Sequence, residues 1–207
     1  MNSTTQKFFR NSFSNVNRKA KFCGIALVAL VTFSCSNDDD NAPPVNEEEL
    51  ITTVTAIYTP QGGGTTVTLQ YKDLDGEGAN APVVTVSGAF AKNTTYNGTV
   101  TFKNELTNPV EDITSEIIAE GTEHQIFYQK TGTLPPFVYG AAASNFDSNG
   151  KVIGLQSAFS TTGAASGNLI ITLRHSPNKN ASNVSAGDIT NAGGSTDAEI
   201  TFSISVL

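Results

Sequence analysis

The chain has 207 residues, with 12 Lys and Arg against 19 Asp and Glu, two Cys and no Trp. Its net charge of −7 argues against nucleic-acid binding, because neutralising phosphates requires clustered Lys and Arg. Two cysteines are too few for a disulfide scaffold or a Cys-rich zinc site, and the length suits one domain, with or without a leader.

Residues 1–34 have the pattern of a secretory signal peptide. Five basic residues and no acidic one occupy residues 1–21, and an apolar run extends from Phe22 to Phe33. As a helix this run would be about 18 Å long, too short for a hydrocarbon core of ~30 Å. We therefore predict that this segment is removed and does not remain as a transmembrane anchor.

Cys35 follows the small residue Ser34, as at the cleavage site of a lipoprotein signal peptidase, although Thr32 and Phe33 depart from the usual residues there. We predict that Cys35 becomes the lipidated N-terminus and carries palmitate; the alternative is a conventional signal peptide and a spare thiol. The next residues resemble the acidic export signal of Bacteroidota lipoproteins, which implies an outer-membrane protein facing the cell exterior. A plain acidic linker explains the same residues, which are Ser36, Asn37, Asp38, Asp39 and Asp40.

Removing the leader sharpens the charge imbalance of the remaining 173 residues. Five of the 12 basic residues leave with it, so seven basic and 19 acidic residues remain, a net charge of −12. Cations are the natural counter-ligands of such a surface, although it also resists non-specific association. Residues 35–49 are acidic and contain little apolar surface to bury, so we predict a flexible tether there and a single domain over 50–207.

From Leu50 onward, short Thr- and Val-rich runs are interrupted by Gly, Asn, Asp or Pro about every ten residues, the pattern of an antiparallel β domain. Apolar and polar residues alternate within these runs, which places one apolar face on each strand. We predict a mainly all-β fold, an antiparallel β-sandwich that is Ig-like or jelly-roll-like. The apolar positions are Val67, Leu69, Tyr71; Tyr96, Val100, Phe102; Leu169, Ile171, Leu173; and Ile200, Phe202, Ile204, Val206.

One stretch breaks the β pattern. Ile113 and Ile117 are four residues apart, Asp112 is suited to an N-cap, and Gly121 is suited to ending a helix. We therefore predict one short helix near residues 112–120.

The chain contains two histidines, His124 and His175. His124 shares its predicted strand face with Ile126, and His175 continues the apolar face that ends at Leu173. Together with the nearby Glu120 and Glu123, the histidines could form a site for zinc or another divalent transition metal. Fifty residues separate the two histidines, so the sequence leaves open whether they meet; the alternative is two unrelated, hydrogen-bonded side chains.

A second candidate metal site has three carboxylates at alternate positions, Asp73, Asp75 and Glu77. These side chains could supply oxygen ligands to Ca²⁺. The segment departs from an EF-hand loop, because its glycine comes too early and Val84 occupies the twelfth position, where a Glu would close the loop. An Asp-Gly hairpin turn explains the segment equally well.

Enzymatic chemistry finds little support in the sequence. There is no Gly-x-Ser-x-Gly elbow and no Gly-rich loop followed by Lys-Ser/Thr. Paired carboxylates of a glycan hydrolase would meet only in space, but the absence of Trp removes the commonest sugar-stacking side chain. We predict a protein that is not an enzyme, with a glycan-acting hydrolase as the weaker alternative.

Several segments of the chain resemble a family of small Bacteroidota outer-membrane lipoproteins that are labelled type 1 periplasmic binding fold superfamily proteins. That label implies two alternating α/β lobes, whereas the length and strand pattern of this chain predict the β-sandwich. The resemblance implies that the protein acts at the cell envelope, beside TonB-dependent transporters. The segments that carry it are Glu47 to Thr55, Gly62 to Gly64, Lys72 to Gly76, Asn93 to Gly98, Gly121 to Tyr128 and Gly187 to Gly194.

The sequence thus predicts a surface-anchored, non-catalytic module that captures a metal ion or another small ligand for TonB-dependent uptake. This hypothesis requires His124 and His175 to lie within ligand distance of each other. The alternative is a structural or adhesive module that binds another protein. It requires an exposed apolar patch around Phe137 and Tyr139, after the rigid Pro135-Pro136 pair.

Overall fold

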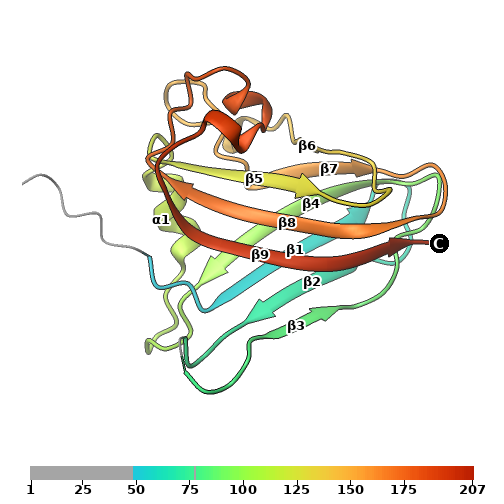
Figure 1. The fold of residues 1–207 in the computed structure, drawn as a ribbon, viewed down its shortest axis with the longest axis horizontal. Helices are drawn as coiled ribbons and strands as arrows, with labels where there is room; N and C mark the ends of the chain where they lie inside the picture. The colour runs from blue at the N-terminus through green and yellow to red at the C-terminus, as the bar shows by residue number, and fades with distance from the viewer. Residues whose placement is uncertain (1–48, 77) are drawn as a thin grey trace, which may run out of the picture. The chain divides into compact units, whose positions relative to one another are not determined.

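The computed structural model describes residues 49–76 and 78–207. They belong to one compact unit that extends to Leu207. Two antiparallel sheets form a sandwich-like β fold, so the predicted fold class is confirmed (Figure 1). The larger sheet has the strand order β3-β2-β1-β4-β7-β6, and the smaller has the order β5-β8-β9.

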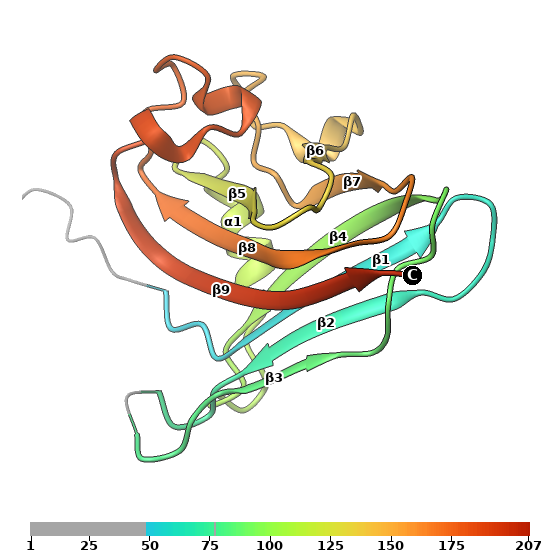
Figure 2. The ribbon, with the colours of Figure 1, turned by 45° about the vertical axis from the view of Figure 1, so that its right-hand side comes forward.

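In chain order the strands are β1 (Thr53–Pro60), β2 (Val67–Lys72), β3 (Val83–Val86), β4 (Thr95–Lys103), β5 (His124–Lys130), β6 (Phe137–Tyr139), β7 (Gln156–Ser160), β8 (Ala165–His175) and β9 (Ser195–Val206). Long β8 and β9 curve across the face of the larger sheet, as the turned view shows (Figure 2). The core lies between these two layers.

The alternating apolar positions predicted from the sequence lie in the core, except Tyr71, which is only partly buried. On β4 and β8, Phe102 and Ile171 are fully buried and belong to one apolar cluster that draws on both sheets. Burying each such side chain contributes about 1.5–3 kcal/mol relative to leaving it in water. The residues next to them, such as Thr101 and Ile170, point to the opposite face and are more exposed. The alternation of apolar and polar residues therefore predicted the buried face of each sheet correctly.

The predicted helix is also confirmed: α1 spans Ile113–Ala119, between β4 and β5. Ile113 and Ile117 are the two buried residues of this helix and join the core. Three short 3-10 turns complete the described structure: η1 (Ala143–Asn145), η2 (Val184–Ala186) and η3 (Ile189–Asn191). The loop carrying η2 and η3 covers the outer face of β5, where Val184 and Ala192 pack on Phe127.

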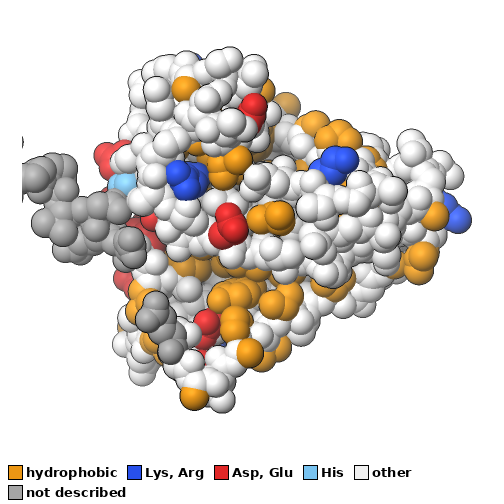
Figure 3. Space-filling view, in the orientation of Figure 1, with side chains coloured by type: hydrophobic (Ala, Val, Ile, Leu, Met, Phe, Trp, Pro, Cys, Tyr) orange, Lys and Arg blue, Asp and Glu red, His pale blue; other side chains and the backbone are white. Residues whose placement is uncertain are grey.

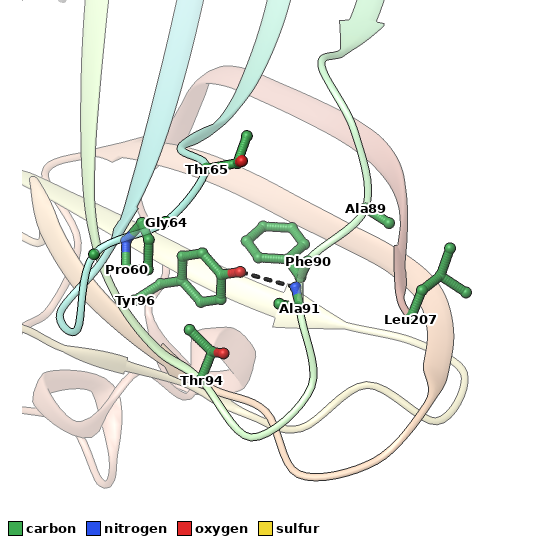
Figure 4. Close-up of a pocket in the computed structure, with 10 residues that line it drawn as sticks. Pro60, Gly64, Thr65, Ala89, Phe90, Ala91, Thr94, Tyr96 and Leu207 are labelled. Atoms are coloured by element: carbon green, nitrogen blue, oxygen red, sulfur yellow. Dashed lines mark hydrogen bonds between the residues drawn. The ribbon is translucent and has the colours of Figure 1, made fainter.

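A cavity of about 310 Å³ lies between the β1–β2 turn, the segment that precedes β4 and the end of β9 (Figure 4). Phe90 and Tyr96 line it, and the Tyr96 hydroxyl accepts a hydrogen bond of 2.8 Å from the Ala91 amide. The two histidines lie near the opposite end of β9, beside its first residues. This cavity is therefore separate from the candidate site.

Candidate metal centre

His124 and His175 are direct partners across two antiparallel strands. His124 is the first residue of β5, His175 is the last of β8, and the strand register places them opposite each other. Opposed residues of an antiparallel pair project to the same side with Cβ atoms about 4.5–5.5 Å apart. The ring centroids lie 4.8 Å apart with the rings at 88°. The sequence left open whether the two histidines meet, and the register of β5 and β8 brings them together.

A β-bulge adds a carboxylate that sequence analysis did not assign. Leu173 pairs with Ala198 and Arg174 with Thr196, so Asp197 is an extra residue on β9. A bulge of this kind re-aims side chains beside it. Strict alternation would place Asp197 on the outer face with Thr201, yet its side chain is fully buried against the histidines.

The contacts of Arg174 and Gly194 explain why the strand is irregular here. The Arg174 guanidinium donates hydrogen bonds to the carbonyls of Gly193 and Gly194 and to the Thr196 hydroxyl. Gly194 has a φ of +70°, and a Cβ atom on it would lie 2.1 Å from the carbonyl oxygen of His175. Only glycine allows the chain to pass this close, so Gly194 positions the start of β9 over the end of β8.

The facing atoms of these side chains are spaced for a shared cation. Asp197 Oδ2 lies 3.7 Å from His124 Nε2 and 4.0 Å from His175 Nδ1, and all three ligand atoms lie within 4.8 Å of one another. Ligand atoms around a tetrahedral zinc ion lie about 3.4 Å apart, given metal–ligand bonds of about 2.0–2.2 Å. Modest side-chain movement would therefore close the three residues on an ion.

Both facing imidazole nitrogens are buried, and within the described residues neither makes a hydrogen bond. The side chain of His124 is fully buried, and that of His175 is 16% exposed. Buried polar atoms are seldom left without a partner, because each costs free energy comparable to a lost hydrogen bond. A bound cation would satisfy both nitrogens.

Glu120 and Glu123, which the sequence grouped with the histidines as metal ligands, lie on the far sides of the rings. The Glu120 carbonyl is 3.3 Å from His124 Nδ1, and its carboxylate is 4.0 Å from the same atom. Glu123 Oε2 lies 3.7 Å from His175 Nε2. Metal-binding histidines commonly present their other ring nitrogen to a carbonyl or carboxylate in this way. Asp197, and neither of these glutamates, is the carboxylate that faces both rings.

These outer contacts orient the rings. An acceptor beside His124 Nδ1 favours the proton on that atom, which leaves the Nε2 lone pair facing Asp197. Glu123 Oε2 lies on the corresponding side of His175, 3.7 Å from Nε2, where it would favour the same orientation of that ring. Two lone pairs and a carboxylate oxygen then converge, an arrangement that a cation stabilises.

The environment of His124 also favours its neutral form. Burial, and then the neighbouring His175, lower the pKa of His124 from its ordinary value of 6.5, although Glu120 acts in the opposite direction. Neutral imidazole is the form that binds metal ions. His124 is therefore held in its metal-binding state.

The described chain begins beside this site, at the half-buried Glu49. Burial and the nearby Glu116, Glu120 and Asp197 raise the pKa of Glu49 from 4.5 to about 7. Acidic side chains surround a histidine at this end of the molecule, visible in Figure 3. The surface beside the site is therefore rich in carboxylates.

Glu49 makes the stability of the metal-free protein depend on pH. Between pH 4.5 and 7 the folded state holds a proton that the unfolded state releases, so the free energy of unfolding falls as pH rises through this window. We expect Glu49→Gln to raise the free energy of unfolding at pH 8 by about 1 kcal/mol or less, because solvent screens the charge of this half-buried side chain. Urea unfolding at pH 8 and pH 4 tests this: the gain should vanish at pH 4, and an equal gain at both would contradict it.

Two carboxylates of the candidate calcium segment accept hydrogen bonds from within their own turn. Asp75 Oδ2 accepts hydrogen bonds from the backbone and side-chain nitrogens of Asn80, and these bonds lower the pKa of Asp75. Asp73 Oδ1 accepts a bond from the Asp75 amide, and its other oxygen lies 3.3 Å from the Tyr71 hydroxyl. Glu77 lies outside the described residues. The contacts of Asp73 and Asp75 match those of a hairpin turn, and calcium binding there stays a prediction.

The apolar patch that an adhesive module would need is not formed around Phe137 and Tyr139. Phe137 is 9% exposed and stacks on Phe159 of the next strand, with ring centroids 4.2 Å apart. Tyr139 is half-buried and donates a hydrogen bond to the carbonyl of Ile126. The Pro135-Pro136 pair therefore leads into a strand that packs on the core.

Other expectations concern residues outside those described. Cys35 and the acidic export segment Ser36 to Asp40 are among them, as is the predicted signal peptide. Within the described part of the chain, no helix is long and apolar enough to cross a membrane.

Comparisons with known proteins give no indication of the function. No family model matches the chain, and neither the curated proteins nor the solved structures contain a significant match to it.

Proposed function

We propose that this protein is a non-catalytic binding module for one divalent transition-metal ion, with Zn²⁺ as the representative cargo. Its ligands are His124 Nε2, His175 Nδ1 and an oxygen of Asp197. One observation carries the proposal: two buried imidazole nitrogens that lack hydrogen-bond partners in the described structure face the same buried carboxylate.

The donor set selects the class of ion. Imidazole suits Zn²⁺, Cu²⁺, Ni²⁺ and Fe²⁺, whereas Ca²⁺ takes six to eight oxygen ligands. Across residues 49–76 and 78–207, the side chains grouped closely enough to hold a metal are these two histidines and Asp197. A calcium or magnesium ion would find a single carboxylate there, so nitrogen-binding metals are favoured.

The number of ligands favours capture over a structural role. Structural zinc sites have four protein ligands, whereas three protein ligands leave a position for water or an exchanging ligand. Of the three side chains only His175 is partly exposed, at 16%, so solvent reaches the group on its His175 side. An ion held in this way can be delivered to a competing partner.

The proposed place of action rests on the sequence. A lipid anchor at Cys35 and the acidic segment that follows it support a position on the outer membrane, facing the exterior. The charge of −12 on the mature chain would concentrate cations near the site. We include delivery to a TonB-dependent transporter in the proposal on these grounds.

Calorimetric titration of the chelator-treated protein with Zn²⁺ tests the proposed site. We expect one ion per chain, and we expect His124→Ala and His175→Ala each to weaken binding by at least about 100-fold, more than the loss of an outer-sphere partner. Asp73→Asn is the matched control, because it removes a carboxylate from the other candidate site, and it should leave zinc affinity unchanged. Binding that is indifferent to both histidine changes would disprove the site.

A further inference from the structure

We infer that Lys179 is a positioning residue for the metal ligand His124, acting through the turn between α1 and β5. The inference rests on the proposed function and adds a residue on the η2 loop that lies outside the ligand set. Its basis is a buried ammonium group that holds the backbone of that turn.

The Lys179 ammonium is enclosed by acceptors. Its side chain is 5% exposed, and that of its partner Asp147 is 1% exposed. Nζ lies 2.9 Å from Asp147 Oδ2 and also donates a hydrogen bond to the carbonyl of Gly121. The other Asp147 oxygen accepts bonds from the amides of Asn149 and Lys151. Asp147 is thereby fixed, and Lys179 joins it to the turn.

The turn that Lys179 holds carries the groups that orient the histidines. Gly121 directly follows Glu120, whose carbonyl accepts hydrogen bonds from the Glu123 amide and from His124 Nδ1. The Glu123 carbonyl in turn accepts a bond of 2.6 Å from the Ser176 amide, next to His175. Anchoring the Gly121 carbonyl therefore restrains the turn from which the adjacent Glu120 carbonyl faces His124 Nδ1, and a fixed acceptor there would favour the proton on that nitrogen.

Stability alone does not explain a buried ion pair. Removing two charges from water is costly, and apolar replacements of similar volume are often as stable or more so. Burial lowers the pKa of Lys179, and Asp147 counteracts this only in part. An apolar pair could not donate a hydrogen bond to the Gly121 carbonyl. This hydrogen bond from Lys179 is the contact that connects the ion pair to the turn beside His124.

Two neutral double variants isolate this donor. Lys179→Met with Asp147→Asn removes it without leaving an unpaired charge, whereas Lys179→Gln with Asp147→Asn keeps an amide donor at the same net charge. Each is compared with the wild-type protein by three measurements: melting temperature, zinc affinity, and the His124 tautomer from ¹⁵N NMR of the metal-free protein. The chain has only two histidines, which makes the imidazole spectrum simple to assign.

With the Met pair we expect a folded protein in which His124 no longer holds its proton on Nδ1 alone, and a loss of zinc affinity of about 10–100-fold. The Gln pair should keep the wild-type tautomer and most of the affinity. Identical tautomers and affinities in the two pairs would overturn the inference, as would a Met pair that fails to fold, since Lys179 would then be structural. If the wild-type protein binds no zinc, the proposed function fails, and the metal-free tautomers still decide the role of Lys179.

Discussion

Replacing Gly194 by alanine is expected to destabilise the protein severely and to disrupt the proposed metal site. The new Cβ would lie 2.1 Å from the carbonyl oxygen of His175 and 2.9 Å from backbone atoms of Ser176, and φ at this position is +70°. The left-handed conformation costs a non-glycine residue about 1–2 kcal/mol, and overpacking typically adds 1–3 kcal/mol, so we expect a loss of about 3 kcal/mol or more. Urea unfolding and zinc titration of the variant measure the two effects.

Gly193→Ala is the matched control for this prediction. Gly193 also has a positive φ, +60°, but a Cβ there would meet no atom within 4 Å. We expect Gly193→Ala to lower the free energy of unfolding by only about 1–2 kcal/mol, the cost of the left-handed backbone conformation, and to retain zinc binding. If the two alanine variants proved equally stable, the close approach of β9 to the end of β8 would not be what demands glycine at residue 194.

Removing the charge of Asp197 is expected to abolish the stabilisation of the protein by zinc. At a free concentration of 100 times Kd, zinc should raise the free energy of unfolding by about 2.7 kcal/mol, because it binds the folded state alone. For a domain of this size that corresponds to an increase in melting temperature of roughly 5–10 °C. Asp197→Asn keeps the shape of the side chain but removes the anionic ligand, so the increase should vanish.

Glu199→Gln is the control for the change at Asp197. Glu199 lies two residues further along β9, is exposed, and faces Thr172 across the strand pair at 3.4 Å. This variant has the same net charge as Asp197→Asn and should keep the full zinc-dependent increase, as measured by differential scanning calorimetry with zinc and with chelator. A retained increase in Asp197→Asn would exclude Asp197 as a ligand.

The fold could be predicted because its determinants are local. Leu169, Ile171 and Leu173 are buried where the period of two places them, and Ile113 and Ile117 form the buried face of α1. A strand or helix that buries one face shows this in its own residues. The burial of Phe137 has a non-local cause, because the neighbouring β7 supplies Phe159, on which that ring stacks.

By itself, the sequence determined the sandwich class, the burial pattern, the strong negative charge and the two histidines as the candidate ligands. The tertiary structure decided that these histidines meet, because the pairing of β5 with β8 joins residues 51 positions apart. It also decided that Asp197 completes the group, since a bulge turns inward a residue that alternation assigns to solvent. Strand register and bulges depend on partner strands and on contacts such as those of Gly194 with His175. They are properties of the assembled sheet that no single segment of the chain encodes.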